Sequence, residues 1–132
     1  MKYLASSLSD ETGVALRQHL FTPWMGPAAL QDHVDHMVDL GMLPLYTEYE
    51  PDQGFREIYW TPQVRTYFEA RSARDEGEFQ EVVDRNRREG NCLATLHISS
   101  DGLYSSTWLG AEAHSSAERL LSQLGISQAE IL

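Results

Sequence analysis

The clearest helical pattern of apolar and polar positions lies between residues 27 and 40. Its apolar positions recur at the three- and four-residue spacing of one helix face: Leu30, Val34, Met37 and Val38. Pro27 suits the first turn of a helix, and Gly41 can adopt the left-handed conformation that ends one. We therefore predict a helix from Pro27 to Leu40.

Two further helices are predicted in the N-terminal half from the residues that can cap them. Ser9 can cap a helix that continues to Leu20. Thr61 can cap another helix that starts at Pro62. The buried face of this second helix is expected to consist of Val64, Tyr67 and Phe68.

Two more helices are predicted in the C-terminal half. One follows a break near 73–75 and ends at Gly90, and its few apolar residues suggest that much of it faces water. The other opens with a capping box made by Ser115 and Glu118 and ends at Gly125. Its apolar positions are Leu120, Leu121 and Leu124.

Two β-hairpins are predicted between these helices. In the first, aromatic and β-favouring residues over 45–49 and 56–60 flank a turn at 51–54. The second joins 92–98 to 103–109 through an Asp-Gly turn. In its first strand, one buried face is predicted from the alternating positions Cys92, Ala94, Leu96 and Ile98.

Together these elements predict an α+β fold in a single domain over 1–132, built from helices and two β-hairpins. A chain of this length buries about two thirds of its unfolded surface, so one core is expected. Two sub-units are considered within the domain, 9–72 and a helix–hairpin–helix over 75–132. The sequence shows us no internal repeat, and strand order stays open.

Composition and charge narrow the class of protein. The formal net charge is -10 at pH 7, and no apolar run approaches the roughly 18 residues of a membrane span. The first residues turn polar too soon for a signal peptide. Cys92 is the only cysteine in the sequence, which excludes an internal disulfide and a cysteine zinc cluster. We therefore expect a cytoplasmic protein with no membrane partner.

The negative charge is concentrated in one stretch of the sequence. No Lys or Arg stands between Arg17 and Arg56, whereas six carboxylates do: Asp32, Asp35, Asp39, Glu48, Glu50 and Asp52. Three aromatic residues of the kind that anchor protein interfaces accompany them: Tyr46, Tyr49 and Trp24. We predict that these residues bind a basic surface of a partner protein. Nucleic acid is not expected as a partner, because such a field repels phosphates.

Two clusters invite a chemical interpretation. His33, His36 and Asp32 would share a helix face, as metal ligands do, but solvated polar residues beside an apolar stripe explain them as well. They are kept as weak metal candidates, and no metal or cofactor is expected. Cys92 and His97 would point to opposite faces of a strand, which makes Cys92 a core residue and not a nucleophile. No P-loop, dinucleotide or Gly-x-Ser-x-Gly motif is present, so an enzyme is not expected.

The order of elements between 27 and 68 resembles a winged-helix domain. The residues that carry the resemblance are Leu40-Gly41-Met42-Leu43, Leu45 to Tyr49, Pro51-Asp52-Gln53-Gly54 and Ile58-Tyr59-Trp60-Thr61-Pro62. The resemblance implies a recognition helix over 27–40, a wing formed by the hairpin, and an earlier helix over 9–20. A recognition helix normally carries basic or amide side chains toward DNA, whereas this one has three aspartates and no Lys or Arg. The resemblance therefore implies a DNA face converted to protein binding.

The sequence thus predicts a non-enzymatic interaction module of the inhibitor, immunity-protein or accessory-regulator type. One alternative is a winged-helix transcription regulator whose DNA contacts come from arginines outside the helix, either Arg65, Arg71 and Arg74 or the cluster of Arg85, Arg87 and Arg88. Another is a protein that binds a metal or a small molecule through His33 and His36. The partner's identity and the oligomeric state stay open, a homodimer included.

Overall fold

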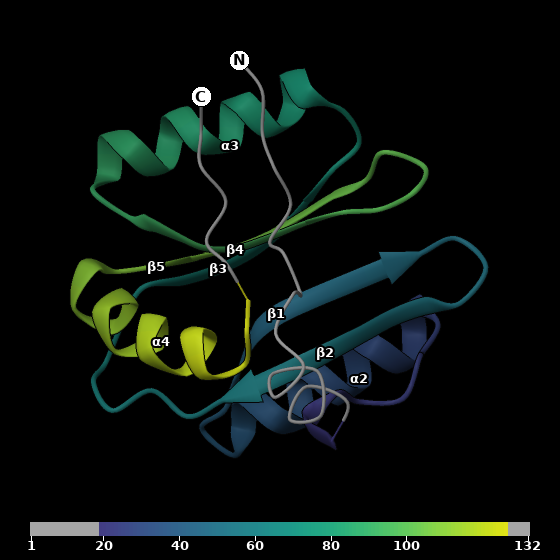
Figure 1. The fold of residues 1–132 in the computed structure, drawn as a ribbon, viewed down its shortest axis with the longest axis horizontal. Coiled ribbons are helices and arrows are strands. Elements are labelled where there is room, and N and C mark those ends of the chain that lie inside the picture. The colour runs from purple at the N-terminus through teal and green to yellow at the C-terminus, as the bar shows by residue number, and fades with distance from the viewer. Residues whose placement is uncertain (1–18, 127–132) are drawn as a thin grey trace.

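A computed structural model describes residues 19–126 of the chain, and Figure 1 shows their fold. In chain order the elements are α2 (Pro27–Asp39), β1 (Leu43–Glu50), β2 (Gly54–Trp60), β3 (Phe68–Ala73), α3 (Glu76–Glu89), β4 (Cys92–Ile98), β5 (Tyr104–Leu109) and α4 (Ala111–Gln123). This order confirms the α+β fold and both predicted hairpins. The helix predicted over 9–20 lies outside the described residues except for its last two.

The elements form layers around two antiparallel sheets. Strands β1 and β2 make one sheet, and the other has the order β3-β5-β4. Helix α3 covers the outer face of the three-stranded sheet, while the β1–β2 hairpin and α4 lie on its inner side (Figure 1). Helix α2 packs on the far side of the hairpin, so α2 and α3 lie on opposite sides of the molecule (Figure 1).

Two clusters of buried apolar side chains hold these layers together. The outer cluster joins α3 to the three-stranded sheet and consists of Ala73, Phe79, Val82, Val83, Leu93, Leu96 and Trp108. The inner cluster joins the hairpin and α4 to that sheet and consists of Leu45, Tyr46, Ile58, Trp60, Ala94, Leu109, Ala113, Ala117, Leu121, Leu124 and Ile126. Over residues 19–126, none of the helices is both long enough and apolar enough to cross a membrane.

Hydrogen bonds from two threonine side chains to a backbone carbonyl also hold the first hairpin on the three-stranded sheet. The carbonyl oxygen of Leu45 accepts hydrogen bonds from Thr95 Oγ1 at 2.8 Å and from Thr107 Oγ1 at 2.9 Å. All three residues are buried. A buried carbonyl outside its own ladder needs such partners, so these two threonines position β1 across β4 and β5.

The helix–hairpin unit occurs twice in the structure. The register of α2–β1–β2 recurs in α3–β4–β5 with every residue shifted by 49 positions. Corresponding pairs are Leu43–Trp60 and Cys92–Leu109, Pro44–Tyr59 and Leu93–Trp108, and Thr47–Glu57 and Leu96–Ser106. A β-bulge interrupts both hairpins at the corresponding place, between Pro44 and Tyr46 and between Leu93 and Thr95. The two units therefore share one backbone design.

Local details of the two units agree as well. A glycine with positive φ follows each helix, Gly41 at 81° and Gly90 at 78°. Each helix carries the same side-chain hydrogen bond, from Gln31 to Asp35 at 3.0 Å and from Gln80 to Asp84 at 2.8 Å. The sequence analysis found no internal repeat, and the structure corrects that conclusion.

The helix predicted from Pro62 is wrong. Residues 61–67 are non-helical, and they lead directly into β3. Strand β3 pairs along the edge of β5 from Phe68 to Ala73. Pairing with a sheet edge distant in sequence decides the conformation here, and local propensity does not report it.

Two smaller predictions are also wrong. Helix α4 begins at Ala111, directly after its N-cap Gly110, so Ser115 lies inside the helix and donates a hydrogen bond to the Ala111 carbonyl at 3.3 Å. In β4 the bulge breaks the predicted alternation, because it places both Leu93 and Leu96 against α3. An extra residue in a strand moves all later side chains to the other face.

Candidate functional site

The outward side of α2 carries the three aspartates predicted to bind a partner. Asp32, Asp35 and Asp39 are exposed, and within residues 19–126 no cationic side chain forms an ion pair with them. Helix α2 has no fully buried residue. Near its end, Val38 is 46% and Leu40 62% exposed. The structure thus brings the aspartates together beside apolar surface.

Two of the predicted surface residues, Tyr46 and Glu48, are buried instead. Tyr46 belongs to the inner cluster, and its hydroxyl donates to Glu48 Oε2 at 3.0 Å. Arg56, opposite Glu48 in the hairpin, donates from Nε to Glu48 Oε1 at 2.8 Å. These contacts satisfy the Glu48 carboxylate inside the protein, so neither residue is free to meet a partner.

The remaining predicted residues lie around the hairpin. Asp52 is exposed in its turn, while Glu50 is partly buried and accepts a hydrogen bond from Ser100 Oγ at 2.8 Å. Tyr49 is half-buried against Phe55, with 4.7 Å between ring centroids. Trp24 is also half-buried, and the Arg56 guanidinium lies 4.5 Å from its ring centroid. Of the nine residues, the exposed ones are Asp32, Asp35, Asp39 and Asp52.

His97 lies on the inner face of β4, between the first hairpin and the sheet. Its ring stands edge-on to Tyr46, with 6.3 Å between centroids, and its Nε2 is 3.9 Å from Glu50 Oε1. Burial lowers the pKa of His97, and the nearby charges of Glu48 and Glu50 offset that effect only in part. Cys92, predicted to be a core residue, is half-buried at the start of the same strand and is in neither buried cluster.

We expect His97 to titrate with a midpoint below 6.5, the ordinary value for histidine. The physical reason is that the imidazolium loses hydration when it is buried. A pH series of NMR spectra that follows the histidine Hε1 signals would measure this, with His97→Gln used to assign the signal. A midpoint at or above 6.5 would mean that the carboxylates of Glu48 and Glu50 outweigh burial.

A second polar cluster lies on the other face of the hairpin, toward α2. Glu57 of β2 is 3% exposed, and its carboxylate accepts hydrogen bonds from Tyr59 at 2.6 Å and from Thr47 at 3.0 Å. The His33 ring of α2 stands edge-on to Tyr59 at a centroid distance of 5.3 Å. Burial raises the pKa of Glu57, although the two hydrogen bonds and His33 oppose this. Burial and the bond to Glu57 raise the pKa of Tyr59 as well.

The sequence analysis missed this cluster. Its signal was the period of two in the hairpin, which places Thr47 opposite Glu57 and sets Tyr59 on the same face as Glu57. Glu57 stood out less than the acidic residues around it, because a single carboxylate in a predicted strand is normally solvent-facing. Its burial depends on α2 and on the segment before α2, where Thr22 Oγ1 accepts from the Glu57 backbone N–H at 3.0 Å.

The three weak metal candidates lie on the same helix, α2, but they do not share the same surroundings. His33 turns toward Tyr59, whereas His36 and Asp32 are exposed. Among the residues that the structure describes, no group of three His, Cys, Asp or Glu side chains is arranged to hold a metal ion.

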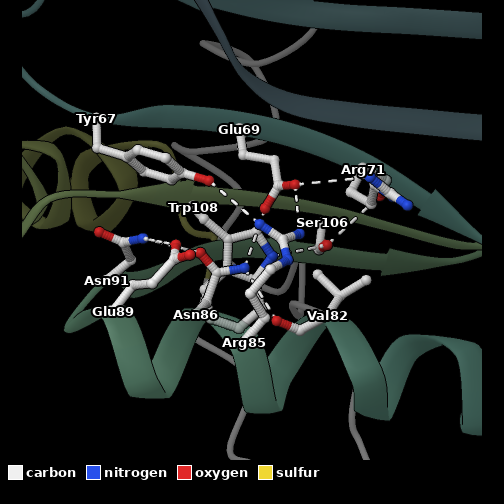
Figure 2. Close-up of polar contacts among 10 residues, drawn as sticks. All are labelled: Tyr67, Glu69, Arg71, Val82, Arg85, Asn86, Glu89, Asn91, Ser106 and Trp108. Carbon is white, nitrogen blue, oxygen red and sulfur yellow. Dashed lines mark hydrogen bonds and ion pairs between the residues drawn. The ribbon is translucent and has the colours of Figure 1, made fainter.

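A third polar network fixes α3 to β3 (Figure 2). Glu69 accepts from Arg85 Nη2 at 2.5 Å and from Asn86 Nδ2 at 3.0 Å, and Arg71 Nη1 lies 3.9 Å from it. Burial acts to raise the pKa of Glu69, but the bonds from Asn86 and Arg85 and the arginine charges outweigh it and lower the pKa. Asn86 is buried and also donates to the Val82 carbonyl. Each residue drawn in Figure 2 has a hydrogen-bond or ion-pair partner. We therefore interpret the network as one that holds α3 against β3.

Comparisons of this chain with protein-family models, with curated proteins and with solved structures found no match.

Proposed function

We propose that this protein is a non-enzymatic interaction module whose α2 binds a basic surface of a partner protein. One observation carries the proposal, namely the difference between α2 and α3 in the duplicated unit. Helix α3 buries four residues, whereas α2, in the same position of its own unit, buries none. A lightly packed amphipathic helix is a common recognition element.

The charges of α2 and α3 also differ in a way that favours α2 as the binding helix. At the positions that Val38 and Asp39 occupy in α2, helix α3 carries Arg87 and Arg88. Helix α3 therefore mixes both signs, as a solvated helix does. Helix α2 has aspartates and no Lys or Arg. A one-sided negative face favours a cationic partner and speeds its encounter.

Exposed apolar side chains adjoin this acidic face. Val38 and Leu40 flank Asp39 at the end of α2. Apolar contact beside complementary charge would slow dissociation of a bound partner, since release depends on the close-packed part of an interface. An inhibitor, an immunity protein or an accessory regulator acts in this way when it covers a basic functional surface.

We expect the triple variant Asp32→Asn/Asp35→Asn/Asp39→Asn to lose partner binding by at least about tenfold, because it removes the steering charge. The matched control is Glu81→Gln/Asp84→Asn/Glu112→Gln, which removes three exposed carboxylates from α3 and α4. Both variants have the same net charge. The measurement is retention of soluble lysate proteins on each immobilised protein, followed by the affinity of the retained partner at two salt concentrations. Equal losses in both variants would contradict a local role for α2.

Three of the six arginines named for the DNA-binding alternative have carboxylate partners among the described residues. Arg71 and Arg85 contact Glu69, and Arg74 lies 3.8 Å from Glu78. Phosphate contacts supply most of the affinity of non-specific DNA binding. Salt-dependent binding of random duplex DNA by the wild-type protein would therefore favour this alternative over the partner-protein proposal.

A further inference from the structure

A cavity of about 390 Å³ lies between α2, the β1–β2 hairpin and strands β3 and β5. Its apolar wall includes Leu30, Val34, Phe55 and Phe68. Glu57, Thr47 and Ser105 add polar groups to the lining. An apolar wall with a few converging polar groups, at this volume, is typical of a small-molecule site.

The second copy of the unit carries no carboxylate or imidazole at the four corresponding positions. There, Val82, Leu96 and Trp108 are packed in the outer cluster, and Trp108 Nε1 donates to Ser106 Oγ at 3.0 Å. The residues at the same four positions of the first copy are His33, Thr47, Tyr59 and Glu57. Burying such groups costs free energy that an apolar packing does not. The second copy shows that the same backbone can hold mainly apolar side chains at these four positions. Stability alone therefore does not explain the polar side chains of the first copy.

Two groups that line the cavity keep unused hydrogen-bonding capacity. The Glu57 carboxylate accepts one bond on each oxygen, and no Lys or Arg among the described residues forms an ion pair with it. A carboxylate has about four acceptor positions, so roughly half remain open. Ser105 is 5% exposed, and its buried Oγ has no hydrogen-bond partner. Buried polar groups in this condition point to a missing partner.

We propose that this cavity binds a small organic cation, a primary ammonium group on an apolar body, with Glu57 as its counter-ion. The ammonium would donate to the open positions of the Glu57 carboxylate, and the apolar body would lie against Leu30 and Phe68. An anion is disfavoured because Glu57 repels it. Arg71 also lines the cavity, but its Nη1 lies 3.9 Å from Glu69 Oε2, so its charge already has a carboxylate partner (Figure 2).

The probe that tests this proposal is 2-phenylethylamine, titrated into the ¹⁵N-labelled full chain at neutral pH and followed by NMR. We expect saturable shifts of amide signals in α2, β2 and β3, with a dissociation constant of about 1 mM or below. The neutral isostere 2-phenylethanol should bind at least about tenfold more weakly, because it lacks the charge that Glu57 recognises.

Two variants and one control make the test specific. Glu57→Gln should weaken binding of the amine at least about tenfold and leave binding of the alcohol unchanged. Ala70→Leu, at an exposed position of the cavity lining, should abolish binding of both by filling the space. Asp52→Asn, a carboxylate in the turn of the same hairpin, should have no effect. Absence of saturable shifts in the wild type, or equal amine affinity in Glu57→Gln, overturns the proposal.

The partner-protein proposal and the amine-binding proposal can be tested independently of each other. The cavity lies on the inward side of α2, and the aspartates are on its outward side. Ala70→Leu should therefore leave partner binding intact, whereas the triple aspartate variant should still bind 2-phenylethylamine.

Discussion

Replacing Trp108 with alanine is expected to lower the free energy of unfolding by about 3–5 kcal/mol. The indole is 1% exposed and belongs to the cluster that joins α3 to the three-stranded sheet. Its removal leaves a cavity in the cluster that also contains Phe79 and Leu96, and it deletes the hydrogen bond to Ser106. Loss of both packing and a buried hydrogen bond places this substitution among the most destabilising that the fold offers.

Equilibrium urea unfolding, followed by circular dichroism, would measure the effect. The control is Leu40→Ala, since Leu40 is 62% exposed and its truncation should cost less than about 0.5 kcal/mol. If the two variants lost similar amounts of stability, the outer cluster would not be the main support of α3.

The sequence predicts several elements well from local signals, although the cap signals at Thr61 and Ser115 are misleading. The predicted Asp-Gly site lies in the loop between Ile98 and Tyr104 that joins β4 to β5, and Gly102 has a φ of 87° there. Helix α3 follows the N-cap Asp75 and ends before Gly90, which has the left-handed conformation. These signals act within a few residues, and here they agree with the tertiary structure. Strand β3 has no comparable signal, because its conformation depends on pairing with β5, which follows it by more than thirty residues.

The repeat of the helix–hairpin unit could not be seen in the sequence, because the two copies share backbone features more than side chains. What the two units share is register, the place of the bulge and the glycine after the helix, and these constrain the backbone more than the side chains. Within the helices, Gln31, Val34 and Asp35 recur as Gln80, Val83 and Asp84, but most other positions differ. Different residues can therefore fill the same backbone frame.

In the candidate site, too, residues placed by a local pattern could be predicted, and residues placed by tertiary contacts could not. The aspartates of α2 could be placed on an exposed surface from helical periodicity alone. Glu48 could not be recognised as buried, because its burial depends on Arg56 across the hairpin and on the inner core. Glu57 could not be recognised as part of a cavity lining, because that cavity also needs β3 and β5, which come later in the chain.

Replacing Glu57 with glutamine is expected to stabilise the protein at neutral pH, and the gain should depend on pH. Burial raises the pKa of Glu57 in the folded state above its unfolded value, so the folded protein holds this proton more tightly. The contribution of Glu57 to stability is therefore fully present below the unfolded pKa, near pH 4.5, and is lost as pH rises through the folded pKa. Each pKa unit of that difference corresponds to about 1.4 kcal/mol. Glutamine imitates the protonated acid and should escape the loss.

The measurement is the difference in unfolding free energy between the wild type and Glu57→Gln from about pH 4 to pH 8, where the variant should gain as pH rises and then level off. Glu48→Gln is the opposing control. It leaves the Arg56 guanidinium with a weaker partner, so it should destabilise the protein at neutral pH by about 1–3 kcal/mol. A wild type as stable as Glu57→Gln at every pH would show that Tyr59 and Thr47 already compensate the buried charge. Stabilisation by removal of the charge would instead mean that the chain keeps a destabilising carboxylate in a cavity, as expected of a group retained for binding.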